Sequence, residues 1–314
     1  MGKREDSIDA EVEPRISRVT EQYFKKSLAR FSEAISQAPW AKDIQFTETV
    51  QHNISVVEDA QERIYARHAK RRGISLEAYK KLLQQHIEEI VSRSQFFKRI
   101  DVNGLEDVLN GSGRFKPKSE TGGESSSKGK PGPTFHRRLF GYQEDIDSAR
   151  LPHYGYLSSD LNGVLNSDPE AMSGYGKITI RFKRQQVIER TTITFGDSWN
   201  SYFSGNDRFL VPTPASHPHF TSANAGPASD PKQSGISDRD PLDLPDSAHP
   251  PTDKIASGSR VHYYEAQYHG GVGRDDIESI HIQQKDWDND HHLQAVVKKF
   301  QTDNPRSNIK IVIF

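Results

Sequence analysis

The chain has 314 residues, of which 33% are hydrophobic, with 42 basic and 43 acidic side chains and a net charge of -1. This balance gives no sign of a nucleic acid or an anionic membrane as a partner. Cysteine is absent, which excludes disulfides, thiolate metal sites and a cysteine nucleophile. The sequence opens without an apolar signal core, and no run approaches the ~18 apolar residues that span a bilayer. We therefore expect a soluble protein, either cytoplasmic or exported without a cleavable signal.

The first third of the chain has a helical pattern. Residues 1–14 are highly charged and are predicted to form a flexible N-terminus. Over 15–103, apolar residues recur at helical spacing and predict a helix over 16–35 and another over 50–72. A third helix is predicted to begin after Ser75, which suits an N-cap. We expect these helices to form a layer packed on the rest of the protein.

Beyond residue 104 the pattern changes to short strands. Alternating or β-branched segments predict strands over 138–142, 154–157, 177–184, 191–195 and 309–314, and one further helix is predicted over 293–300. Short strands without a regular alternation of helices indicate an α+β fold rather than a doubly wound sheet.

The segment 212–254 differs in composition from the rest of this region. Nine of the 17 prolines lie between Pro212 and Pro251, together with many Ser and Asp residues and few aliphatic ones. This composition predicts a disordered insertion within a domain that covers 104–314. We therefore expect a chain that lacks residues 215–252 to fold and to keep its activity.

The strongest candidate for a functional site is the segment 261–272, which has the pattern of a strand that ends at Gly270 and Gly271. Side chains alternate across a strand, so Glu265, Gln267 and His269 are predicted to share one face. A carboxylate and an amide in this arrangement can hydrogen-bond a sugar and a second reactant at once. The alternative is an edge strand with a solvated polar face.

Other segments supply further candidates for a binding site. Arg114 follows a glycine turn, and its guanidinium would suit a diphosphate, although a surface arginine before a loop is the alternative. Thr192 and Thr194 share a strand face and can brace a carboxylate or an amide, or can reflect ordinary β propensity. Tyr154 and Tyr156 can stack on a base or a nicotinamide, or can pack in the core.

Several kinds of catalytic site are excluded by their missing motifs. Ser198 follows Gly196 and Asp197, but the residue two after it is Asn200, so no Gly-x-Ser-x-Gly elbow is present. The sequence also lacks a phosphate-binding P-loop, and it contains no His-Glu-x-x-His motif for zinc.

Four segments together resemble the CteC-like group of ADP-ribosyltransferases, bacterial effectors that attach ADP-ribose to a threonine of ubiquitin. The matching segments are 119–123 (SETGG), 153–157 (HYGYL), 189–198 (ERTTITFGDS) and 265–272 (EAQYHGGV), and they cover about residues 104–285. The last two segments are the more specific. One feature departs from the pattern, because many ADP-ribosyltransferases have Gln-x-Glu or Glu-x-Glu where this chain has Glu265-x-Gln267.

The resemblance implies an ADP-ribosyltransferase-like split β-sheet core with the N-terminal helical layer packed on it. It also implies NAD as co-substrate and no metal. Glu265 would stabilise the oxocarbenium ion as nicotinamide leaves, and Gln267 and His269 would orient the acceptor hydroxyl, with His269 accepting its proton. The residues implied to bind NAD are Arg114 at the diphosphate, together with Thr121, Gly122, Tyr154, Tyr156, Thr192, Thr194 and Ser198.

The function implied is mono-ADP-ribosylation of a threonine hydroxyl, with ubiquitin as the acceptor protein, which would block ubiquitination. An effector of this kind would be secreted into a host cell without a cleavable signal. Two alternatives stay open. One is an NAD glycohydrolase, in which water replaces the protein acceptor. The other is a non-enzymatic adaptor that uses its helical region to bind a partner.

Overall fold

The computed structural model describes residues 29, 45–116, 133–143, 146–163, 175–195, 212–218, 240, 242 and 264–314. The helix predicted over 16–35 lies outside this part of the chain, apart from residue 29. The next two predicted helices are confirmed as α2 (Phe46–Arg71) and α3 (Leu76–Arg93). Ser75 caps α3 as expected, since its hydroxyl accepts a hydrogen bond of 3.1 Å from the amide of Ala78.

The described strands form one eight-stranded sheet with the order β5-β4-β6-β2-β1-β3-β7-β8. Every pair is antiparallel except β7 with β8. The fold is therefore mixed α and β around a mostly antiparallel sheet, and this sheet is continuous rather than split. Its strands are β1 (Gln95–Ile100), β2 (His153–Ser158), β3 (Ile178–Phe182), β4 (Thr191–Phe195), β5 (Thr213–Pro214), β6 (Tyr264–Tyr268), β7 (Ile277–Ile282) and β8 (Lys310–Ile313).

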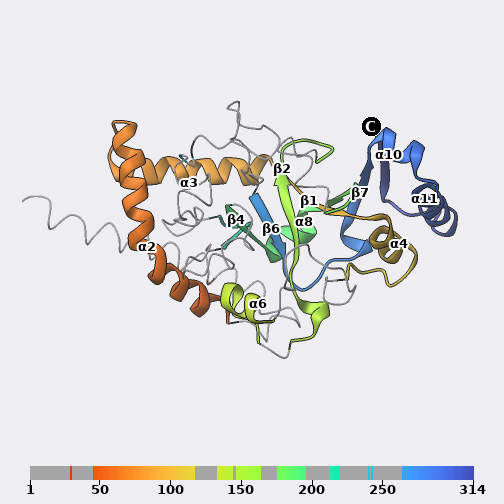
Figure 1. Cartoon of the computed structure of the whole chain (residues 1–314), viewed down its shortest axis with the longest axis horizontal. Coiled ribbons are helices and arrows are strands. Elements are labelled where there is room, and N and C mark those ends of the chain that lie inside the picture. The colour runs from red at the N-terminus through yellow and green to blue at the C-terminus, as the bar shows by residue number, and fades with distance from the viewer. Residues whose placement is uncertain are drawn as a thin grey trace, which may run out of the picture.

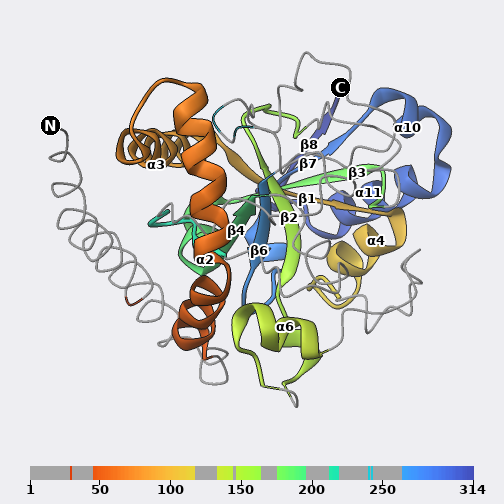
Figure 2. The same ribbon diagram turned by 60° about the vertical axis from the view of Figure 1, so that its left-hand side comes forward.

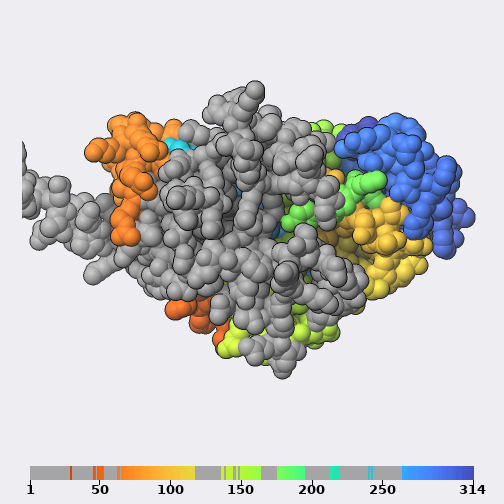
Figure 3. Space-filling model, in the orientation of Figure 1, coloured from red at the N-terminus to blue at the C-terminus, as the bar shows by residue number. Residues whose placement is uncertain are grey.

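The remaining helices lie at different positions around this sheet (Figures 1 and 2). They are α4 (Val102–Asn110), α6 (Pro133–Phe140), α8 (Arg184–Val187), α10 (Gln284–Asn289) and α11 (His291–Asp303), with short 3-10 turns at 148–150, 188–190 and 274–276. Helices α2 and α3 lie at one end of the molecule, and α4, α10 and α11 at the other (Figures 1 and 3). Helix α6 packs beside the start of α2 (Figure 2).

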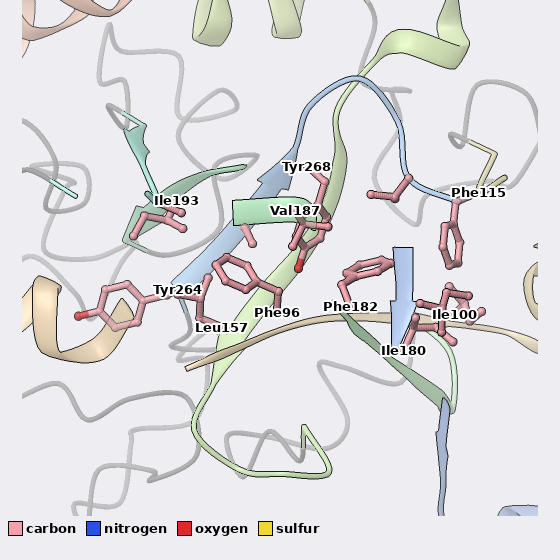
Figure 4. Packing of buried hydrophobic residues seen from close by; sticks show 14 of the residues in the cluster. Phe96, Ile100, Phe115, Leu157, Ile180, Phe182, Val187, Ile193, Tyr264 and Tyr268 are labelled. Atoms are coloured by element: carbon pink, nitrogen blue, oxygen red, sulfur yellow. The ribbon is translucent and has the colours of Figure 1, made fainter. Parts of the chain in front are cut away.

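One face of the sheet is apolar and carries the core. Ile178, Ile180 and Phe182 of β3 are fully buried on this face, as their alternation predicts. Tyr264 and Tyr268 of β6 lie in the same cluster (Figure 4). The cluster also contains buried side chains of α2, α3, α4 and α11, so the helical layer and the sheet share one hydrophobic core.

Two sequence predictions of secondary structure are wrong. The helical pattern over 15–103 predicts no strand at 95–100, yet these residues form β1, a central strand whose Phe96 and Phe97 are buried. The strand predicted over 138–142 is instead the end of α6 and the residues that follow it. Pro133 begins this helix and Gly141, with a φ of 78°, ends it, which is the usual asymmetry of proline and glycine at helix ends.

Parts of the proline-rich segment pack against the folded protein, although most of it lies outside the described residues. Strand β5 at its start pairs with β4, and Gln84 of α3 donates a hydrogen bond to the carbonyl of Pro218. Asp240 is 8% exposed and accepts a 2.6 Å hydrogen bond from the hydroxyl of Tyr79, and it also pairs with Arg72. The contacts of Pro218 and Asp240 oppose the expectation that removal of 215–252 would be without effect.

The Asp240 contact gives a stability prediction. Burial by itself would raise the pKa of Asp240, but the hydrogen bonds from Tyr79 and Arg72 outweigh it and lower the pKa. Tyr79→Phe removes one donor from this buried carboxylate and should lower the free energy of unfolding by roughly 1–3 kcal/mol at pH 7. Denaturant unfolding measures this value. In the Asp240→Asn background the same substitution should cost clearly less, and an equal cost in both backgrounds would contradict the contact.

Candidate functional site

Strand β6 is an interior strand of the sheet, because it lies between β4 and β2. On β6, Glu265 is opposite Thr194 of β4, and Gln267 is opposite Thr192. Directly opposed residues point to the same face, so these four side chains meet on the face away from the hydrophobic core. All four are buried, which makes the alternative of an edge strand with a solvated face wrong.

These side chains form a continuous hydrogen-bonded network. The side-chain nitrogen of Gln267 lies 2.8 Å from Glu265 Oε1 and 2.8 Å from the hydroxyl of Thr194. Its carbonyl oxygen accepts a 2.8 Å hydrogen bond from the hydroxyl of Thr192. Thr192 also lies 2.8 Å from His269 Nε2. The network therefore extends from Glu265 to His269, and it brings together the three expected catalytic residues with both threonines.

His269 is enclosed by aromatic rings at the far end of the network. The hydroxyl of Tyr142 lies 2.7 Å from His269 Nδ1, and the two rings stack with centroids 5.9 Å apart. Phe140 of α6 meets the same imidazole edge-on at 5.0 Å, and Phe46 of α2 lies at 6.3 Å. Burial lowers the pKa of His269 to about 3, and Arg190 and His136 contribute further. The imidazole is therefore neutral at pH 7.

The turn after β6 is held by Arg190. Its guanidinium donates to the carbonyls of His269 and Gly271 and to the carboxylate of Asp276 at 2.6 Å. Gly270 and Gly271 both have φ near 75°, a conformation that favours glycine. The sequence motifs do not identify Arg190 as a site residue. Its position immediately before the threonine-rich strand is the one signal that could have pointed to it.

The two expected tyrosines are on β2, opposite β6. Tyr154 is opposite Gln267, and its hydroxyl lies 3.1 Å from Nδ1 of His136, a buried residue of α6. Tyr156 is opposite Glu265, donates a 2.6 Å hydrogen bond to the carbonyl of Gly163 and stacks on a phenylalanine of β1. Tyr154 is the more accessible of the two, since it is only half-buried.

Arg114 lies in a short bridge with Gly273, three residues after Gly270. It is half-buried, and its charge contributes to the lowered pKa of His153, a shift caused mainly by burial. Arg114 therefore lies near His153, the first residue of β2, at the same end of the sheet as the Gly270–Gly271 turn. The remaining expected residues, Thr121, Gly122 and Ser198, lie outside the described residues.

A second polar cluster lies on the same face of the sheet, on β7. Ser279 is 2.7 Å from His281 Nε2, and His281 Nδ1 is 3.1 Å from the side-chain oxygen of Asn162. Burial, with a contribution from Arg181, lowers the pKa of His281 to about 4. Such an imidazole is a weak base at pH 7, so the cluster is poorly suited to activate Ser279 as a nucleophile.

Other kinds of site receive little support from the described part of the chain. It contains no group of three or more His, Asp or Glu side chains placed to hold a metal ion. Its helices include none long and apolar enough to cross a membrane. A surface hollow of about 490 Å³ next to α11 is lined by Lys183, Arg274 and residues 303–309, but by none of the described site residues.

No protein-family model matches the chain, and no curated protein matches it. The geometry around Glu265 and the sequence motifs are therefore the observations from which the function can be inferred.

Proposed function

We propose that this protein is a mono-ADP-ribosyltransferase that cleaves NAD and transfers ADP-ribose to a threonine hydroxyl of a protein, with ubiquitin as the acceptor. The observation that carries the proposal is the pairing of Glu265 with Gln267 on an interior strand, 2.8 Å apart and braced by Thr192 and Thr194. A carboxylate and an amide fixed in this way can meet a ribose and an acceptor together.

The role proposed for Glu265 is electrostatic. When the bond between ribose C1′ and nicotinamide breaks, positive charge develops on the ribose as an oxocarbenium ion, and nicotinamide leaves as a neutral molecule. A carboxylate beside the ribose stabilises that charge, as carboxylates do at other glycosidic centres. Of the two polar residues on this part of β6, only Glu265 carries a charge, so we assign this role to Glu265 rather than to Gln267.

The acceptor hydroxyl then attacks C1′ and passes its proton to the carboxylate of Glu265. Gln267 is proposed to orient this hydroxyl once the site opens, through the second lone pair of its amide oxygen, because hydrogen bonds to Thr192 and Glu265 hold the amide in place. His269 is a poor candidate to accept the proton, since both ring nitrogens already have partners and its side chain is 1% exposed. We therefore assign His269 to positioning rather than to proton transfer, and Glu265 remains the base nearest the ribose.

Substrate access requires the site to open. Glu265 is 4% exposed and Gln267 is fully buried. Binding of NAD must therefore be coupled to a movement of the chain that covers these residues. Tyr154, half-buried on the neighbouring strand, is the expected residue closest to solvent on this face and is proposed to stack on the nicotinamide or the adenine.

Arg114 is proposed to bind the diphosphate of NAD through its planar guanidinium. Arg114→Lys keeps the charge but removes the paired donors, so the KM for NAD should rise by about tenfold or more. Steady-state nicotinamide release at varied NAD concentration measures this. Arg306→Lys, at an exposed position near the C-terminus, is the matched control and should leave KM unchanged. An unchanged KM for Arg114→Lys would remove Arg114 from the site.

Nicotinamide release also separates the proposed function from its alternatives. A transferase should release nicotinamide faster when ubiquitin is present, because the acceptor completes the reaction. A glycohydrolase should release it at the same rate with and without ubiquitin. An adaptor should release none under either condition, and this result would overturn the proposal.

A further inference from the structure

We infer that Tyr142 and His269 form an orienting relay that fixes the amide of Gln267 against Glu265. The geometry of the relay is independent of any activity, whereas its catalytic consequence rests on the proposed function. Neither Tyr142 nor His269 is expected to touch the reacting atoms, so both are positioning residues.

The direction of each hydrogen bond in the relay follows from the number of hydrogens that each group can donate, starting at Glu265. The NH2 of Gln267 donates to Glu265 Oε1 at 2.8 Å, and this direction suits an ionised carboxylate, which only accepts hydrogen bonds. The second hydrogen of this NH2 is directed to the hydroxyl of Thr194. The carbonyl oxygen of Gln267 is then left to face Thr192, and it needs a donor there.

Thr192 has one hydroxyl hydrogen, and the carbonyl of Gln267 takes it. The contact of 2.8 Å between Thr192 and His269 Nε2 therefore requires a hydrogen on Nε2. A neutral imidazole carries only one such hydrogen, so Nδ1 must accept, and the hydroxyl of Tyr142 at 2.7 Å supplies the donor. The low pKa of His269 agrees with this neutral form.

Every hydrogen bond in the chain thus points the same way, from Tyr142 through His269, Thr192 and Gln267 to Glu265. If the amide of Gln267 were reversed, its oxygen would face the carboxylate and the hydrogen assignments on Thr192 and His269 would have to change as well. Such a network is stable only when it is satisfied throughout, because each member is buried. Tyr142, 123 residues away from Glu265 in sequence, thereby helps to hold the orientation of the catalytic pair.

Nitrogen-15 NMR of the full chain tests the relay directly. His269 should carry its hydrogen on Nε2 and accept at Nδ1. Tyr142→Phe keeps the ring that stacks on His269 and removes only the hydroxyl. It should shift both the Nδ1 signal of His269 and the side-chain NH2 signals of Gln267. A hydrogen on Nδ1, or unmoved Gln267 signals in Tyr142→Phe, would overturn the relay.

The catalytic consequence is read from kinetics on the same variants. Tyr142→Phe should lower kcat for nicotinamide release roughly tenfold and leave KM for NAD unchanged. A loss of this size is expected when a hydrogen-bond partner that orients a substrate-contacting group is removed. Tyr79→Phe, which removes an equally buried hydroxyl on α3, is the matched control and should keep both values. An unchanged kcat in Tyr142→Phe would overturn the positioning role. If the wild-type protein released no nicotinamide, the proposed function would fail and the NMR result would still decide the relay.

Discussion

Glu265→Gln should lower the rate of nicotinamide release from NAD by at least about a hundredfold, which is the usual cost of losing one group that stabilises charge in a transition state. The substitution preserves the size of the side chain and an oxygen that can accept the hydrogen bond from Gln267. It removes the negative charge and replaces one accepting oxygen with an NH2 group. The lost activity would therefore report electrostatic stabilisation of the oxocarbenium ion rather than a change in packing.

The matched control for this experiment is Glu278→Gln on β7. Glu278 is also a carboxylate on an interior strand, and it pairs with Arg181 at 3.2 Å, but it lies outside the Glu265 network. It should keep nearly full activity. Circular dichroism and thermal unfolding should confirm that both variants fold. Wild-type rates in folded Glu265→Gln would remove Glu265 from the catalytic role.

Acidification should strongly destabilise the protein at pH values well above those at which its carboxylates become protonated. Burial lowers the pKa of His136 and of His269 from 6.5 to about 3, and it places the pKa of His153 well below 6.5. Below pH 6.5 the unfolded chain therefore binds protons that the folded chain does not. His136 and His269 each lower the free energy of unfolding by about 1.4 kcal/mol per pH unit until the pH approaches 3, and His153 lowers it in the same direction.

His136 and His269 together should cost about 3 kcal/mol per pH unit between pH 6 and pH 4, and His153 adds to this loss. Domains are commonly stable by only about 5–15 kcal/mol, so unfolding is expected within this range. Denaturant unfolding at several pH values measures the slope. His136→Gln should reduce it by about 1.4 kcal/mol per pH unit, whereas His291→Gln, at an exposed position, should not change it. An unchanged slope in His136→Gln would contradict the buried neutral state.

Much of the secondary structure could be predicted because local signals agree with the final packing. The serine cap at Ser75 and the alternation over 178–182 are examples, and both are realised in the fold. Strand β1 was missed because its central side chains, Phe96 and Phe97, lie on opposite faces of the sheet and are both buried. A strand that is buried on both faces loses the alternation that identifies it.

The residues of the candidate site were likewise only partly predictable from the sequence. The alternation along β6 predicted that Glu265, Gln267 and His269 share a face, and they do. The partners Tyr142 and His136 could not be predicted: His136 lies on α6 and Tyr142 two residues after its end, and the sequence pattern predicts a strand over 138–142 instead of this helix. Their contacts depend on how α6 packs on the polar face of the sheet, which no local pattern encodes.

The intact mass of ubiquitin after incubation with this protein and NAD, with Glu265→Gln in parallel, tests the proposed transferase activity most directly. With the wild-type protein, one added ADP-ribose is expected, located on a threonine by fragmentation. With the variant, no addition is expected. Ubiquitin of unchanged mass in the presence of wild-type protein would contradict ubiquitin as the acceptor. If nicotinamide were also absent from that reaction, the proposed cleavage of NAD would be contradicted as well.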